Sequence, residues 1–193
     1  EYYGIDSIEC SDQSFSNTFV GIKVNEEYKQ NTICGKSVSR YYGSIDEIED
    51  QGIKWMITDS NELIIYGEGS IPDYTRHKHP DWYQYKEKIT SITIREGIES
   101  IGKKSFKEFI ELERIEISNS VVNIEDGVFD GCVKLERIEV SSGNTVYHSM
   151  NNCLIEKSTK TLIICGKNSV IPADGSVTRI GNGAFSGYDF SSI

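Results

Sequence analysis

Two histidines have the spacing that metal chemistry requires. His77 and His79 flank Lys78 in the segment TRHKHPDW. If this segment were a strand, both imidazoles would lie on one face and could share a metal ion, with Asp73 or Asp81 as a third ligand. A polar surface loop explains the same residues and is the favoured interpretation. We therefore predict no metal site and no cofactor.

The chain has five cysteines and no C-x-x-C pair, so neither a zinc ribbon nor a thioredoxin-like motif is indicated. Cys153 begins the run CLIEK (153–157) and Cys165 ends the run TLIIC (161–165). A symmetric hairpin around 158–160 would place these two cysteines opposite each other, close enough for a disulfide. Packed thiols are the favoured state at this stage, and a Cys153–Cys165 disulfide is the alternative.

Catalytic signatures are missing from the sequence. It contains no G-x-S-x-G, no phosphate-binding loop and no dinucleotide fingerprint. The net charge of −10 argues against nucleic acid and against anionic membranes as partners. No apolar run approaches the ~20 residues that a membrane span needs, so we predict no membrane insertion in this segment. We predict that the chain is not an enzyme.

A 23-residue repeat must position the remaining side chains. The segments GIESIGKKSFKEF (97–109), SVVNIEDGVFDGC (120–132) and SVTRIGNGAFSGY (176–188) keep their apolar residues at the same spacing. In the first two units a shift of 23 superimposes apolar residues upon apolar residues throughout. The superimposed pairs are Ile92 with Ile115, Ile94 with Ile117, Ile98 with Val121, Ile101 with Ile124, Phe106 with Phe129, Phe109 with Cys132 and Leu112 with Leu135.

Each unit has the pattern of two short strands and one compact turn. ERIEI (113–117) alternates apolar and polar residues, as a half-buried strand does, and VVNI (121–124) forms a second extended piece. The glycines of DGVFDGC (126–132) indicate the turn. Because one unit cannot bury its own apolar residues, successive units must stack, which predicts a mainly β solenoid with short helical turns. We expect Ile101, Ile124 and Ile180 to line up along its axis.

The pattern L-x-x-I-x-I-x-x-x-V-x-x-I-x-x-x-x-F-x-x-C resembles the BspA-like leucine-rich repeat family. The matching residues are Leu112, Ile115, Ile117, Val121, Ile124, Phe129 and Cys132. The resemblance implies a right-handed leucine-rich-repeat coil and a secreted or cell-surface protein. It also implies adhesion, with a host or extracellular-matrix protein as the partner.

The repeat and its resemblance suggest a domain plan. We expect an N-terminal cap over 52–88, built on a β-hairpin around 59–61, and a hairpin inserted near 143–172. The expected repeat units are 89–111, 112–134 and 135–190 within a solenoid that runs over 89–193. Residues 1–51 have no assigned fold beyond a strand in 19–24 and a helical turn starting at Ser44. The chain is expected to be a fragment of a longer protein.

Charged residues occupy the exposed positions of the repeat strands. Stacking should place Arg114 beside Arg137 and Glu116 beside Glu139, which forms a striped charged face. These four residues are our candidate docking surface for a protein partner, and solubility is the plainer explanation. Two other functions stay open: a metal-dependent accessory or hydrolytic domain that uses His77 and His79, and a structural spacer for another domain.

Overall fold

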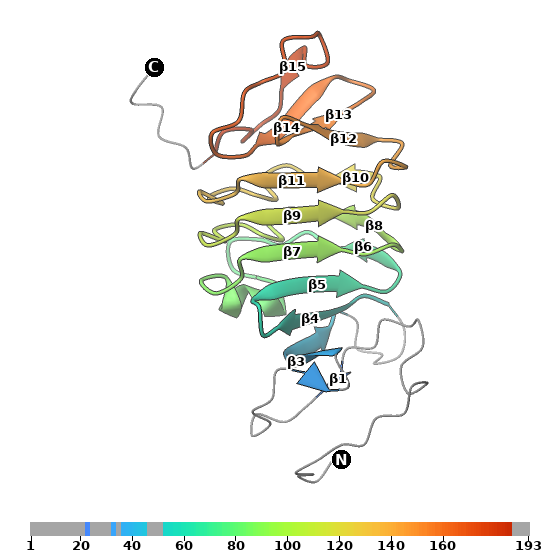
Figure 1. Ribbon diagram of the computed structural model, residues 1–193, viewed down its shortest axis with the longest axis vertical. Coiled ribbons are helices and arrows are strands. Elements are labelled where there is room, and N and C mark those ends of the chain that lie inside the picture. Colours follow the sequence, from blue (N-terminus) through green and yellow to red (C-terminus); the bar gives the residue numbers. More distant parts are fainter. Residues whose placement is uncertain (1–21, 24–31, 34–35, 46–51, 187–193) are drawn as a thin grey trace.

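The structure is a computed structural model, and it describes residues 22–23, 32–33, 36–45 and 52–186. These residues form a stack of short strands with one short helical element (Figure 1). The strand predicted in 19–24 is described only at Ile22–Lys23, where it is present. Most of the helical turn predicted from Ser44, and the end of the third repeat unit after residue 186, lie outside the described residues.

The main sheet runs along one side of the stack. Its strand order is β1-β3-β4-β5-β7-β9-β11, with β2 paired to β3. From β5 onward all neighbours are parallel, as a stack of repeat units requires. The strands are β1 (Ile22–Lys23), β2 (Thr32–Ile33), β3 (Lys36–Ser44), β4 (Lys54–Thr58), β5 (Glu62–Tyr66), β7 (Ser91–Ile94), β9 (Arg114–Ile117) and β11 (Arg137–Val140).

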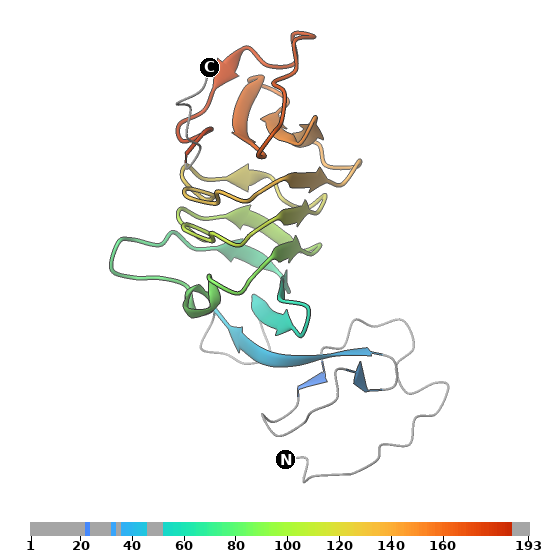
Figure 2. The same cartoon turned by 60° about the vertical axis from the view of Figure 1, so that its left-hand side comes forward.

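A second parallel sheet consists of β6 (Gly69–Ile71), β8 (Ile98–Ile101) and β10 (Asn123–Ile124). The first two repeat units therefore each contribute one strand to each sheet, whereas the third contributes β11 to the main sheet alone, and the turned view shows the two strand layers (Figure 2). The register confirms the 23-residue period, since Ile101 pairs with Ile124 in this sheet and Ile115 pairs with Ile138 in the main one.

The core lies between these two sheets and continues through the turns. Nearly all the repeated apolar residues in the first two units are less than 5% exposed, and Ile124 is 8% exposed. Phe106 stacks between Trp82 and Phe129, with ring centroids 6.2 and 5.9 Å apart. Each such side chain contributes on the order of 2 kcal/mol by leaving water. Stacked apolar rows are therefore the main stabilising feature of the described fold.

The hairpin at the N-terminal side of the stack joins β4 to β5. It pairs Trp55 with Ile65 and Ile57 with Leu63. Directly opposed residues on antiparallel strands project to the same side, and all four side chains are buried in one core.

The short 3-10 helix η1 (Asp81–Tyr85) follows the hairpin and buries Trp82 completely. The indole N–H of Trp82 donates to the main-chain oxygen of Ser105, 3.0 Å away, in the turn of the next unit. A buried indole needs such an acceptor. The helix is thereby fixed to the edge of the stack where the repeat turns lie.

A third sheet closes the C-terminal side of the described residues, in the order β12-β13-β14-β15. Its strands are β12 (Tyr147–Met150), β13 (Cys153–Glu156), β14 (Thr161–Cys165) and β15 (Arg179–Ile180). β13 and β14 form an antiparallel hairpin, and β15 pairs in parallel with β14.

The expected alignment of Ile180 with Ile101 and Ile124 is wrong. Ile180 pairs with Leu162 of β14 and is 55% exposed, whereas Ile101 is fully buried. The reason is that β14 offers a parallel edge for β15, while the edge of β10 is already occupied. There the main-chain N–H of Ile124 donates to the hydroxyl of Tyr147 at 2.9 Å.

Candidate interaction surface

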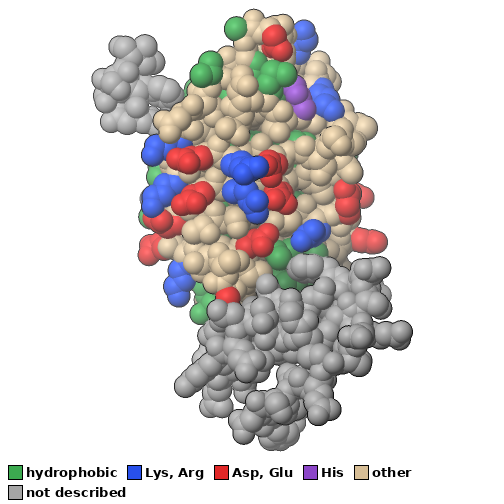
Figure 3. Space-filling view, viewed as in Figure 1, with side chains coloured by type: hydrophobic (Ala, Val, Ile, Leu, Met, Phe, Trp, Pro, Cys, Tyr) green, Lys and Arg blue, Asp and Glu red, His purple; other side chains and the backbone are tan. Residues whose placement is uncertain are grey.

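Two rows of charged side chains cross the solvent face of the main sheet. Arg114 pairs in register with Arg137, and Glu116 with Glu139. The Ile side chains between them face the core, so strand alternation directs all four charged side chains outward. Figure 3 shows blue and red side chains gathered over β9 and β11.

The ion pairs on this face run along each strand. Nη1 of Arg114 lies 3.2 Å from Oε1 of Glu116, and Nε of Arg137 lies 2.7 Å from Oε1 of Glu139. All four side chains are at least 40% exposed, so these pairs add little to stability and can be exchanged for contacts with a partner.

Two open hollows border the rows. One lies where the strands begin and is lined by Glu62, Glu113 and Glu136 beside the two arginines. The other lies between β11 and the third sheet, where Glu139 and Ser149 are among its lining residues. Both hollows are shallow and polar, a shape that suits contact with a macromolecule better than enclosure of a small substrate.

The two histidines lie in the exposed loop before η1. His79 stacks on Tyr83, with ring centroids 4.0 Å apart. The hydroxyl of Thr75 accepts from the main-chain N–H groups of His77 and Lys78. Among the residues that the structure describes, no three His, Cys, Asp or Glu side chains are grouped to hold a metal ion.

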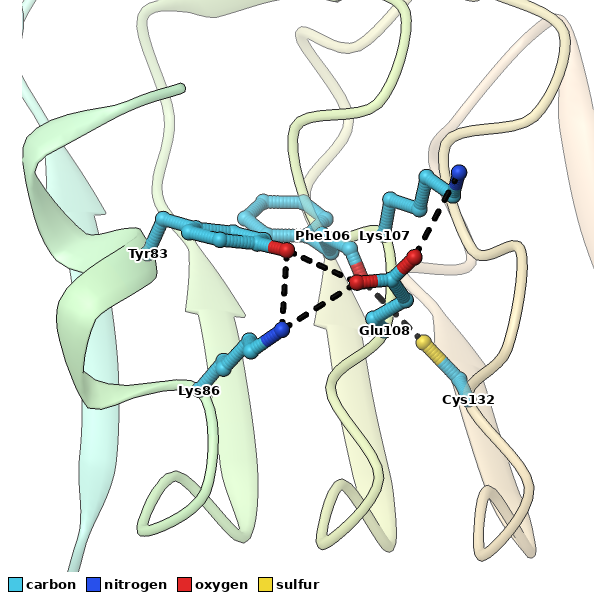
Figure 4. A network of polar contacts seen from close by, with 6 residues as sticks. All are labelled: Tyr83, Lys86, Phe106, Lys107, Glu108 and Cys132. Carbon is cyan, nitrogen blue, oxygen red and sulfur yellow. Dashed lines mark hydrogen bonds and ion pairs between the residues drawn. The ribbon is translucent and has the colours of Figure 1, made fainter. Parts of the chain in front are cut away.

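A polar cluster that sequence reasoning missed joins η1 to the first repeat turn (Figure 4). The hydroxyl of Tyr83 donates to Oε2 of Glu108 at 2.7 Å. Nζ of Lys86 donates to the Tyr83 hydroxyl at 2.8 Å and to the same Oε2 of Glu108 at 3.1 Å. The hydrogen bonds from Tyr83 and Lys86 lower the pKa of Glu108 to about 2. A sequence signal existed, because Glu108 stands where the next unit has Gly131, and both residues have positive φ.

The cysteines are described at three positions. Cys153 and Cys165 are register partners on β13 and β14 and are joined by a disulfide rather than left as packed thiols. Cys132 is buried and free, and its thiol donates to the main-chain oxygen of Phe106. Burial raises the pKa of Cys132 to about 12, which makes this thiol unreactive at neutral pH.

Among the described residues, no helix has the length and apolar character that crossing a membrane requires.

Short parallel strands stacked with a 23-residue period place the chain in the class of leucine-rich-repeat proteins. Residues 79–193 match the BspA type leucine rich repeat region in six copies. This match covers more than half of the 193-residue chain, so the chain belongs to the BspA-type leucine-rich repeat family. Members of repeat families of this kind generally bind proteins.

Solved bacterial structures resemble parts of the chain. A leucine-rich repeat protein from Eubacterium ventriosum is 22% identical, with a TM-score of 0.33, and the match covers 70% of this chain and 61% of that one. A leucine rich cell surface protein from Faecalibacterium prausnitzii is 14% identical, with a TM-score of 0.23, over 65% and 62% of the two chains. The pneumococcal vaccine antigen PcpA is 16% identical, with a TM-score of 0.22, over 62% and 56%. No curated protein matches the chain.

Proposed function

We propose that the chain is a non-catalytic binding module that contacts a protein partner through the charged strand face, defined as Arg114, Glu116, Arg137 and Glu139. The observation that carries the proposal is the register of β9 and β11, which sets like charges side by side on a rigid sheet. Neighbouring strands lie ~4.8 Å apart, so the four charged groups form a fixed pattern that a partner of complementary charge can match.

The electrostatics of the face favour exchange of its ion pairs. Arginine is enriched among the residues that dominate binding energy, because its planar guanidinium forms paired hydrogen bonds. On this face each guanidinium already has a Glu partner, so the arginine charges are paired while no binding partner is present. A partner that brings its own carboxylate to Arg137 would add a second acceptor and would also cover the ion pair from water.

We further propose that the protein works outside the cell or on its surface, where a host or extracellular-matrix protein is the partner. The Cys153–Cys165 disulfide supports this location, because such bonds persist in oxidising environments. The family resemblance supports adhesion as the purpose of binding.

In this proposal the domain plan follows the stack. The segment 52–88 would cap the N-terminal end of a right-handed solenoid, since β5 and β6 extend both parallel sheets by one step. The hairpin β13–β14 would be an insertion within the third unit, 135–190.

A charge-swap variant tests the binding face. Arg114→Glu, Glu116→Arg, Arg137→Glu and Glu139→Arg together keep the net charge and allow both ion pairs to form again. The matched control swaps Glu111 and Lys134, an exposed pair 2.6 Å apart at the turn edge. Immobilised extracellular-matrix proteins should retain the wild type and the control, and lose the strand-face variant. Equal retention of all three would exclude this face.

Elemental analysis separates the metal-dependent alternative from the binding module. Stoichiometric zinc in the purified chain that is lost on His77→Ala would favour an accessory or hydrolytic domain. The spacer alternative makes a different prediction. If the chain is only a spacer, the immobilised matrix proteins should not retain even the wild type.

A further inference from the structure

A basic loop projects from the stack between β6 and η1 (Figure 2). Residues 75–79 are all exposed, and they include Arg76 and Lys78. Within the part of the chain that the structure describes, neither side chain has a carboxylate within 4 Å or a hydrogen-bond partner. The loop is nevertheless ordered by its own hydrogen bonds, since the N–H of Thr75 donates to the main-chain oxygen of Lys78 at 3.0 Å.

Both ends of the loop are anchored to the first repeat turn. The N–H of Tyr74 donates to the main-chain oxygen of Lys103 at 2.9 Å, and the indole of Trp82 donates to that of Ser105 at 3.0 Å. Lys104 lies between the two anchor points. Its ammonium group also has no carboxylate partner among the described residues. The anchors therefore place Lys104 at the base of the loop that carries Arg76 and Lys78.

Lys104 stands at a position where glycine would fit with less strain. Its φ is +62°, and the corresponding residues of the later units are Gly127 at +70° and Gly183 at +76°. A left-handed conformation costs a side-chain-bearing residue about 1–2 kcal/mol, and glycine avoids this cost. The lysine side chain adds no ion pair that would offset the strain. A role in binding would explain a lysine at this strained position.

The local charge is opposite to that of the whole protein. The chain has a net charge of −10, yet this edge carries Arg76, Lys78 and Lys104. Asp73 is already engaged, since its carboxylate accepts from the N–H of Lys103 at 2.8 Å and lies 3.7 Å from Nζ. Asp81 remains as the acidic neighbour. Over residues 75–81 together with Lys104, three cations stand against the one carboxylate of Asp81, so this segment is positive on an acidic molecule.

We propose that the basic edge, defined as residues 75–79 with Lys104, binds the carboxylate or sulfate groups of an anionic polysaccharide. The guanidinium of Arg76 can hold such a planar or tetrahedral anion with two hydrogen bonds, and the two lysines add point charges. A nucleic acid fits less well, because its dense phosphates would be repelled by the acidic body of the protein. A membrane fits less well too, because residues 75–79 include no large apolar side chain to insert.

The probes for the test are low-molecular-weight heparin, which carries sulfate and carboxylate groups, and polygalacturonate, which carries carboxylate alone. Titration calorimetry at low salt should show binding of at least one of them, and 0.5 M NaCl should abolish it. Preference between the two probes identifies which anion the edge takes. Uncharged dextran should not bind, and a DNA duplex that bound as tightly as the better polysaccharide would overturn the proposal.

Charge-removing variants locate the binding. Arg76→Gln with Lys78→Gln should weaken affinity about 25-fold, at roughly fivefold for each exposed ionic contact. The matched control, Lys167→Gln with Arg179→Gln, removes the same charge from exposed positions on the hairpin side and should stay within twofold. An equal loss in the control would show that only net charge matters and would overturn the proposal.

Lys104 provides a test that separates binding from folding. Lys104→Gly and Lys104→Gln should each weaken polysaccharide affinity about fivefold. Only Lys104→Gly should raise the Tm, because only glycine relieves the left-handed strain. Unchanged affinity in both variants would exclude Lys104 from the site. The strand-face charge swap should leave polysaccharide binding intact, so this inference and the proposed protein-binding function can fail separately.

Discussion

The side-chain amide of Asn144 donates to the main-chain oxygen of Val121, the residue one repeat before it, at 2.8 Å. It also donates to Ser118 at 2.8 Å, and its oxygen accepts from the N–H groups of Val146 and Tyr147. The residue is 1% exposed. A single buried amide thus ends the regular line of second strands and directs the chain into β12.

Replacing this amide should destabilise the protein strongly. Asn144→Val keeps the size of the side chain and resembles Val121, but it removes the partner of four main-chain groups, three of them buried and one partly buried. We expect a loss of about 3 kcal/mol in the free energy of unfolding, measured by urea denaturation. Asn123→Ala, at an exposed position, is the control and should change stability by less than about 0.5 kcal/mol. Similar values for the two variants would contradict the role of Asn144.

The disulfide should stabilise the third sheet. Cys153 and Cys165 are separated by 12 residues, and a closed loop of this size restricts the unfolded chain by about 3 kcal/mol. Cys153→Ala with Cys165→Ala should lower the free energy of unfolding by a similar amount.

Trypsin can cut after Lys157 and Lys160, between the cysteines. A single mass that joins both fragments before reduction, and two masses afterwards, would verify the bond, whereas two masses before reduction would refute it.

The cluster around Glu108 predicts a pH dependence. The pKa of Glu108 is about 2 in the folded state, below the ordinary value of 4.5, so its contribution to stability is present above pH 4.5 and is lost as pH falls toward 2. Because the Glu108 side chain is 46% exposed, the contribution should be under about 1 kcal/mol. Urea denaturation should find Glu108→Gln less stable than wild type at pH 6 and equal to it near pH 2. A difference that persists at pH 2 would rule out this origin.

The aromatic ladder should make the core sensitive at Phe106. This residue is fully buried between two other rings, so Phe106→Ala should cost about 3–5 kcal/mol in the free energy of unfolding. Phe185 holds the same place in the third unit but is only partly buried, so Phe185→Ala should cost less. Thermal and urea denaturation of both variants measure the difference. Equal losses would mean that the third unit continues the ladder fully.

Repeat spacing predicted the stacked part of the fold well. Ile92, Ile115 and Ile138 lie in one register because each unit buries its apolar residues only against copies with the same spacing. Ile180 has the repeat spacing but does not align with the other isoleucines, because it pairs with β14. The spacing could not predict this competing strand edge. Local pattern therefore predicted the strands, while the choice of partner strand depended on a contact distant in sequence.

The candidate surface was predictable in position but not in detail. Alternation alone places Arg114 and Glu116 on the outer face, and the period places Arg137 beside Arg114. The direction of the ion pairs depends on side-chain rotamers, which the pattern does not specify. The cluster of Tyr83, Lys86 and Glu108 joins residues more than 20 positions apart and outside any motif, so the sequence signal at Glu108 could not identify its partners.

Cross-linking tests the register of the charged strand face most directly. In-register parallel neighbours lie ~4.8 Å apart, within disulfide range, whereas a diagonal pair lies about 8 Å apart and outside it. We predict that Arg114→Cys with Arg137→Cys forms a disulfide under mild oxidation, detected by peptide mass mapping, and that Arg114→Cys with Glu139→Cys does not. A bond in the diagonal variant and none in the in-register variant would contradict the stacking on which the proposed function rests.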